Sequence, residues 1–365
     1  MTRRYLMSLG VAGVAIAVVS VLAIPIAAQA QKPATPTAAA PARPAAKPWT
    51  APRTPWGDPD LQGIWNFATS TPLERPAAVG EKPVLSGAEA EEFEDKLAFD
   101  LTRDRRDGGN EADVRRAYNE HWMDPRRLQL LTDKRTSLIV DPPDGRIPPR
   151  VPLTPQRKQV AQDAAARAAR FDAGLPLSAQ DFTPPIRGII RTDRVPYLGT
   201  IYNNTAQIFQ SRGSVVIVQE MIHSARVIPV DGRPHLGPNL RQWLGDTRGR
   251  WEGTTLVVET TNFRRDDGAV YGNANPDTFT IVERFTRVAP DTLTYEFTIS
   301  DPNTWTRPWT AMVPWARITE QLYEYSTHED NYDLVHLLVG ARVMEAKGAK
   351  VPEPSGRPGG ADADR

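Results

Sequence analysis

The sequence predicts a mainly β protein of the α+β class, in which an antiparallel meander of about ten strands closes into a barrel. Three observations predict it. From about residue 202 onward, short runs alternate apolar and polar residues and are separated by turn residues. The connections between these runs are short. Helical periodicity is confined to an inserted segment at about 86–175 and to a C-terminal helix at 332–345.

The first thirty residues are predicted to be a signal peptide. Arg3 and Arg4 precede an apolar run at 9–28, which ends in an A-x-A site at 28–30. The paired arginines resemble a twin-arginine export signal, and the run also suits the general secretory route. Retention as a membrane anchor is the alternative. The cleavage-like site favours removal, and hence an exported protein, periplasmic or extracellular, with no stable membrane span.

Two further segments are predicted to be disordered. Residues 31–57 are rich in Pro, Ala and Thr, which forbids a regular helix or a central strand. Residues 348–365 are rich in Gly, Pro and charged residues. This leaves 58–347 as a single barrel-like domain.

Composition excludes several classes of function. The chain of 365 residues has 44 Lys+Arg and 44 Asp+Glu, so nothing points to a nucleic-acid partner. Arginine-rich runs at 103–106, 115–116 and 126–127 are interpreted as solvated helix faces. Cysteine is absent, which excludes disulfides, thiolate metal sites and a cysteine nucleophile. Stability must therefore come from a large core.

The helices of the insertion are predicted from their start signals. Ser86 and Glu89 have capping-box spacing and begin the first helix. Asn110 is placed to cap a second helix that reaches residue 122. Thr154 followed by Pro155 begins a third helix, which runs to 172 and whose alanine-rich sequence indicates close packing.

The strands are predicted from alternation and from the turns that bound them. In order they lie at 61–67, within 137–149, and at 206–210, 215–220, 225–230, 248–252, 255–259, 279–288, 293–299, 306–313 and 322–326.

The hairpin at 245–263 has a predicted register. If Gly253 and Thr254 form a type II′ turn, one face carries Trp251, Leu256 and Val258. The other face carries the charged residues Arg248, Arg250, Glu252 and Glu259, together with Val257. Two interpretations stay open for the charged face. It is either a charge ladder on a solvated surface or the lining of a site where Arg248 and Arg250 hold an anion.

Candidate acid–base groups come from the histidines of the β region. His223 and His328 are candidates for proton transfer, oriented by Glu324 or Glu329, although Glu329 also suits capping of the last helix. A metal site formed by His223, His235 and His328 is the least favoured interpretation. We therefore predict no metal and no cofactor.

Candidate ligand-binding groups combine arginine with aromatic and amide side chains. Trp305, Arg307 and Trp309 share one face if their segment is a strand, so the guanidinium can stack on an indole. The remaining candidates are Arg226, Arg248, Arg250, Asn203 and Asn204.

Several stretches together resemble an uncharacterised family of exported bacterial proteins: PDLQGIWN, RTSLIVDPPDGRIPP, IYNN, EMIHSARVIPVDGRPH, RQWLGDTRGRWEG, VERFTRV, TWTRPWT and HEDNY. The resemblance covers most of 58–345 and implies export. This chain departs from the family pattern at Thr280, Thr254 and Asp330, where histidine, aspartate and glycine are usual. If that histidine is catalytic in the family, the resemblance implies that this chain is inactive or only binds. More loosely, Gly63-Ile-Trp65 before a meander resembles a lipocalin-type calycin barrel.

Three functions remain. The first is an exported protein that binds a small apolar or aromatic molecule with a polar or anionic end in the barrel cavity. The second is a metal-independent enzyme that uses a His/Glu/Arg site in that cavity. The third is a structural envelope module, which a completely filled barrel interior would favour. The oligomeric state is left undetermined.

Overall fold

The computed structural model describes residues 49–102, 104, 107–110, 120–266, 268–329 and 331–351, which belong to one compact unit beginning at Pro48. Its helices are α1 (Gly87–Leu101), α3 (Pro155–Asp172) and α4 (Asp333–Ala346). Its strands are β1 (Gly63–Asn66), β2 (Ile139–Asp141), β3 (Thr205–Ser211), β4 (Ser214–Gln219), β5 (Ala225–Pro229), β6 (Asp246–Glu252), β7 (Thr255–Thr261), β8 (Thr280–Ala289), β9 (Thr292–Ser300) and β10 (Trp309–Ile318).

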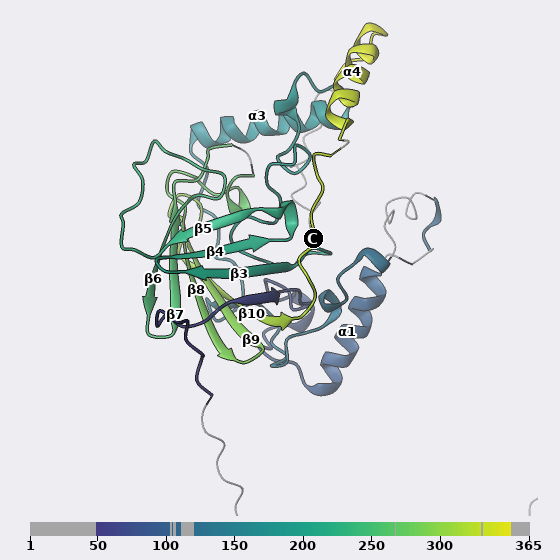
Figure 1. Cartoon of the computed structure of the whole chain (residues 1–365). Helices are drawn as coiled ribbons and strands as arrows, with labels where there is room; N and C mark the ends of the chain where they lie inside the picture. The colour runs from purple at the N-terminus through teal and green to yellow at the C-terminus, as the bar shows by residue number, and fades with distance from the viewer. Residues whose placement is uncertain are drawn as a thin grey trace, which may run out of the picture. The chain divides into compact units, whose positions relative to one another are not determined.

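All ten strands form one antiparallel sheet, as the sequence predicts (Figure 1). The order is β5-β4-β3-β1-β10-β9-β8-β7-β6, and β2 pairs with β10 beside this path. Most neighbours are also neighbours in sequence, which is a meander. The first strand, β1, lies between β3 and β10. It therefore connects the group β3–β5 to the group β6–β10 within the sheet. The two free edges are therefore β5 and β6, in the middle of the chain.

The predicted barrel closure is wrong, because β5 and β6 share no backbone ladder. The two edges touch only through side chains. A Cβ added to Gly249 of β6 would lie 2.8 Å from side-chain carbons of both Ile228 and Val230. Pro229 ends β5 and has no N–H to donate across the gap. We call this unpaired junction the seam.

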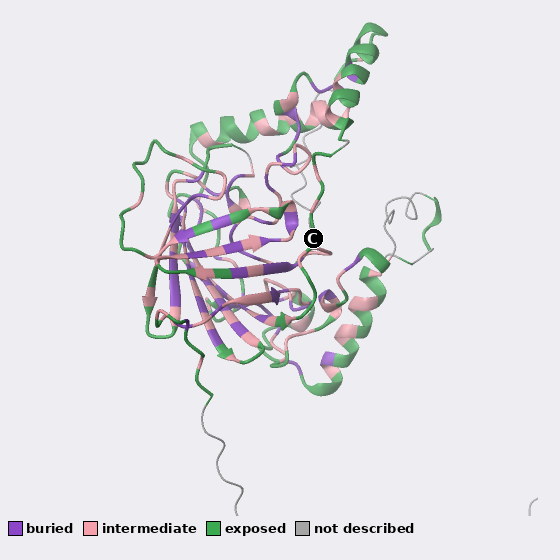
Figure 2. Ribbon diagram, in the orientation of Figure 1, coloured by how far each residue is buried: buried purple, intermediate pink, exposed green. Residues whose placement is uncertain are grey.

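The concave face of the sheet is filled with side chains. Successive strand residues alternate between buried and partly exposed, as Figure 2 shows. The largest side chains with less than 2% exposure are mostly aromatic: Trp65, Trp309, Trp315, Tyr197, Tyr295, Phe263, Phe285 and Phe297. Their rings contact one another, for example Phe285 and Tyr295 at 4.9 Å between centroids. These aromatic side chains fill the centre of the sheet interior, where the sequence predicted a ligand cavity.

Two predicted helix starts are confirmed. At α1, Ser86 and Glu89 form both hydrogen bonds of a capping box. At α3, Thr154 accepts from Arg157 N, and the helix ends at Asp172. The close packing predicted for α3 is wrong, because none of its residues is buried. Most of the second predicted helix, with residues 111–119, lies outside the described residues.

The end of the chain follows the prediction in part. Leu322–Ser326 is not a strand, since residues 319–327 run without regular structure after β10. α4 forms where a helix is predicted and buries Ala341. It is apolar on more than one face, however, because Val335 and Val339 are each 58% exposed. None of the described helices has the length and hydropathy to cross a membrane.

Part of the segment predicted as a linker belongs to the folded unit. Arg53 forms a β-bridge with Pro59, and Thr54 is buried. The Trp49 ring lies 5.9 Å from the guanidinium carbon of Arg287 in β8.

The predicted hairpin register is confirmed at every pair, from Arg248 with Glu259 to Glu252 with Thr255. Gly253 has φ +62°, as the turn requires. On the charged face, Glu252 accepts from Arg250 and from Arg284 of β8. Arg250 and Glu252 are exposed and Arg284 is partly exposed, so this part of the face is a charge ladder.

Candidate functional site

Buried ionisable and amide side chains gather at one end of the sheet, where β4 ends and β5 begins. The chain between 182 and 198, which we call the roof segment, lies over this end. It has no strand or long helix, yet Phe182, Ile190, Asp193, Val195 and Tyr197 are all buried. The Tyr197 amide donates to the Tyr295 hydroxyl of β9 at 3.2 Å. The roof segment is therefore part of the core.

Arg226 of β5 is the centre of this cluster. Its guanidinium forms a bidentate ion pair with Glu283 of β8. Its remaining N–H groups donate to Tyr197, Thr247 and Thr260. All five N–H groups of the guanidinium thus have acceptors. Arg226 therefore has no N–H left for the anion that the sequence assigned to it.

The Arg226–Glu283 pair is inside the core, with side-chain exposures of 4% and 0%. Burial lowers the pKa of Arg226, but the charges and hydrogen bonds of Glu283 and Tyr197 together outweigh it and leave the pKa above its usual value. Burial also raises the pKa of Tyr197 to about 12 and that of Tyr295 well above its usual value. The Tyr295 hydroxyl donates to Glu283 at 2.9 Å. The network ties the β5 edge to β6, β7 and β8 across the seam.

Two residues beside this network have unsatisfied polar atoms. Gln219, at the end of β4, is 1% exposed, and neither its amide nitrogen nor its amide oxygen has a hydrogen-bond partner among the described residues. Asp193 of the roof segment is 2% exposed, and its Oδ2 likewise lacks a partner there. Ser224 links them, because its carbonyl accepts from Gln219 N and its side chain hydrogen-bonds Asp193. Burial raises the pKa of Asp193.

The two predicted asparagines lie next to this cluster. Asn204 is buried and donates to Asp124 at 3.1 Å and to the Thr200 carbonyl. Asn203 has φ +54° and hydrogen-bonds Glu220, the residue after Gln219. Burial raises the pKa of Glu220. Both asparagines are engaged in positioning loops.

The other predicted arginines each bond an acidic partner. Arg248 donates to Asp246 and to the Pro234 carbonyl, both at 2.7 Å. Arg307 is bidentate on Asp141, with both distances 2.8 Å.

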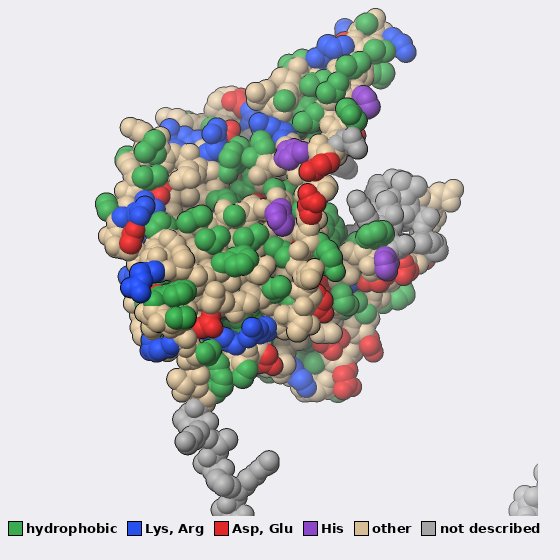
Figure 3. All heavy atoms as spheres, in the orientation of Figure 1, with side chains coloured by type: hydrophobic (Ala, Val, Ile, Leu, Met, Phe, Trp, Pro, Cys, Tyr) green, Lys and Arg blue, Asp and Glu red, His purple; other side chains and the backbone are tan. Residues whose placement is uncertain are grey.

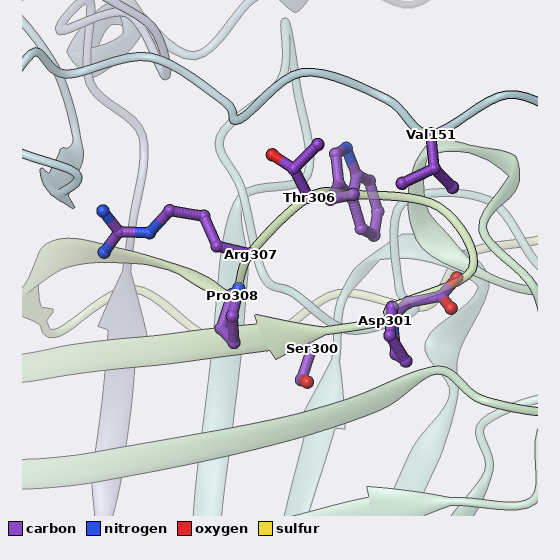
Figure 4. A pocket seen from close by; sticks show the side chains of 8 residues that line it. Val151, Ser300, Asp301, Thr306, Arg307 and Pro308 are labelled. Atoms are coloured by element: carbon purple, nitrogen blue, oxygen red, sulfur yellow. The ribbon is translucent and has the colours of Figure 1, made fainter.

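Trp305 and Arg307 border a shallow cleft of about 160 Å³ (Figure 4). In Figure 4 the Arg307 side chain points away from Asp301. Asp301 accepts from Thr278 Oγ1 and from Asn275 N, both at 2.6 Å. Trp309, on the sheet interior, is 0% exposed. The cleft therefore offers no free ionic group to a ligand.

The predicted acid–base residues are on the surface. His223, His328, Glu324 and Glu329 are all exposed. Figure 3 shows histidine side chains next to acidic ones on the face above β4 and β5. His328 packs on the roof segment, since a Cβ added to Gly188 would lie 2.7 Å from its Cε1. Among the described residues, neither histidine ring bonds a glutamate side chain that would orient it.

A third histidine, His235, has carboxylates near both of its ring nitrogens. His235 Nδ1 lies 2.7 Å from Asp246 Oδ2, and its Nε2 lies 3.5 Å from Glu259. Asp246 is 2% exposed and also accepts from Leu236 N and Arg248. No group of three His, Cys, Asp or Glu residues that could hold a metal occurs in the described part of the chain. The three-histidine metal site is not formed there.

The sequence analysis missed Asp193, Gln219 and Glu283. A signal for two of them is present in the strands. Gln219 follows Val215 and Ile217 at alternate positions, and Glu283 stands between Ile281 and Phe285. A polar residue at a buried position of a strand needs a partner or a purpose. Asp193 gives no such signal, because its loop has no periodicity.

Comparison with known proteins adds little. No family model matches the chain, and no curated protein does. Among solved structures, it is similar to a secretary abundant heat soluble (SAHS) protein from Ramazzottius varieornatus, with 10% identity and a TM-score of 0.21. The match covers 31% of this chain and 70% of the other. A likeness this low carries no functional argument.

Proposed function

We propose that the protein is an exported binding protein that holds a small molecule between Asp193 and Gln219, beneath the roof segment. One observation carries this proposal. Three buried side-chain atoms of these two residues have no hydrogen-bond partner among the described residues. Leaving a buried polar group unsatisfied costs about 1–3 kcal/mol. Groups that cost this much are often retained for function.

The chemistry of the free atoms defines the ligand. Asp193 Oδ2 and the Gln219 carbonyl are acceptors, whereas the Gln219 amide nitrogen is a donor. The matching ligand carries an N–H or O–H donor beside an acceptor, as an amide or a hydroxy-amine does. An anionic end, which the sequence predicted, fits poorly because the guanidinium of Arg226 in the neighbouring network is fully bonded.

Entry requires a movement of the roof segment. Asp193 itself belongs to this segment, and Tyr197 within it contacts Phe67, Tyr295 and Trp315. We propose that the ligand binds when the roof segment lifts from the sheet and closes again. Binding then adds hydrogen bonds that the ligand-free protein lacks.

The test uses the isosteric variant Gln219→Met. Without ligand, its free energy of unfolding in urea should exceed that of the wild type by about 1–3 kcal/mol, because the substitution removes an unsatisfied amide. Thermal-shift screening of amides and amino alcohols should give hits with the wild type that Gln219→Met loses. Native mass spectrometry of protein from its own host should show the bound molecule.

The matched control is Gln207→Met. Gln207 lies on the neighbouring strand β3, where it pairs with Val218 and is partly exposed. This variant should keep the ligand response. If Gln219→Met is less stable than the wild type and no compound shifts either protein, then buried water satisfies the amide and the proposal fails.

A further inference from the structure

Two arginines lie over one indole at the ends of two strands, β8 and β10. Arg287 lies near the end of β8 and Arg317 near the end of β10. Their guanidinium carbons lie 5.7 and 6.0 Å from the centroid of Trp65, in β1. Arg287 also faces the ring of Trp49. Cation–π contacts hold both side chains at the rim of the filled sheet.

Neither guanidinium is paired with a carboxylate among the described residues. Arg287 donates to two backbone carbonyls, those of Asp60 at 3.2 Å and Pro290 at 2.7 Å. Its Nε is buried and has no acceptor there. Arg317 is exposed and makes no side-chain hydrogen bond within the described chain. Other arginines of the sheet and its flanks each bond an acid: Arg226, Arg248, Arg250, Arg284 and Arg307.

The nearby acidic side chains are bonded elsewhere. Asp60 accepts from the backbone and side chain of Gln62. Asp291 accepts from Thr292, although its carbonyl accepts from Arg317 N. Burial and the charge of Arg317 both lower the pKa of Arg287, while Asp60 opposes them. Two cations therefore face each other at this rim without a bound counter-charge.

We propose that Arg287 and Arg317 form a binding site for a compact oxyanion, either a carboxylate or a phosphate group. The anion would sit between the two guanidiniums at the rim and accept hydrogen bonds from Arg317. It would relieve the repulsion between the two cations. This site shares no residue with the proposed ligand site at Asp193 and Gln219, so the two proposals can be tested independently.

Thermal unfolding at constant ionic strength tests the site. Chloride is exchanged for phosphate, sulfate or acetate, and the midpoint of the wild type should rise with the logarithm of anion concentration above the dissociation constant. The response to phosphate against acetate separates the two chemistries. Arg317→Gln should weaken anion binding at least tenfold in calorimetric titration, whereas Gln219→Met should leave it unchanged.

The control is Arg250→Gln, which removes an exposed arginine from the charge ladder. It should keep the full anion response. A purely structural role, in which the arginines only cover Trp65, predicts that Arg317→Gln lowers the midpoint equally in every anion. That result, or a wild type that no oxyanion stabilises beyond chloride, overturns the proposal.

Discussion

Glu283→Leu tests whether the Arg226 network holds the sheet together. The substitution removes the partner of a buried cation and an acceptor for the Tyr295 hydroxyl. Breaking a buried pair from one side costs about 3–5 kcal/mol. A domain has only about 5–15 kcal/mol of stability in total. We therefore expect a loss of about a fifth or more of the unfolding free energy, measured by urea unfolding with far-ultraviolet circular dichroism.

The double variant Arg226→Met/Glu283→Leu tests whether the stability is lost because the buried charge of Arg226 is left unpaired. Replacing both partners with apolar residues of similar volume removes the uncompensated charge, so most of the lost stability should return. Full recovery is not expected, because the Tyr197 hydroxyl loses its donor, Arg226. The exposed control Glu252→Leu should cost less than about 1 kcal/mol. If Glu283→Leu loses less unfolding free energy than the control, or if the double variant is as unstable as Glu283→Leu, the Arg226 network does not stabilise the sheet in this way.

Three further predictions concern the roof segment and the seam. Because burial raises the pKa of Asp193, the wild type loses stability as pH rises from about 4 through the raised value. In urea unfolding, the free energy of unfolding of Asp193→Asn should therefore rise relative to that of the wild type over that pH window. A difference between the two proteins that stays constant with pH contradicts this. Gly249→Ala should lower the free energy of unfolding by about 1–3 kcal/mol, because the added methyl group overpacks against Ile228. Hydrogen exchange in β5 should then be faster, and unchanged exchange contradicts the prediction. Gly188→Ala, at φ +64° and against His328, should speed proteolysis within 319–329, and an unaltered cleavage rate counts against the contact.

Much of the local structure could be predicted because the deciding interactions are close in sequence. Gly253 supplies the φ of its turn, and the alternation of Trp251 with polar neighbours then fixes the hairpin register. Ser86 and Glu89 satisfy each other within one turn of helix. In each case the residues that decide the conformation are less than ten positions apart.

The seam and the site could not be predicted, because they depend on distant pairs. Arg226 meets Glu283 after 57 positions. Alternation along a strand puts Glu283 and Arg284 on opposite faces, but it does not say which face is the interior. Closure failed as a prediction for a similar reason. Pairing of β5 with β6 depends on how Ile228 and Val230 pack at Gly249, which a pattern of alternation does not contain.

Within the buried cluster, hydrogen bonding distinguishes residues that hold the fold together from a residue that is a candidate for ligand binding. Every side-chain nitrogen of Arg226 and both carboxylate oxygens of Glu283 have a partner, and these hydrogen bonds join β5 to β6, β7, β8 and β9. Their polarity is explained by the fold. Gln219 lies on the same face of the sheet, yet its side-chain amide bonds nothing among the described residues. A leucine or methionine there would fold at least as well. The amide of Gln219 is thus the side chain whose presence the fold does not explain, and it is where a ligand should first be sought.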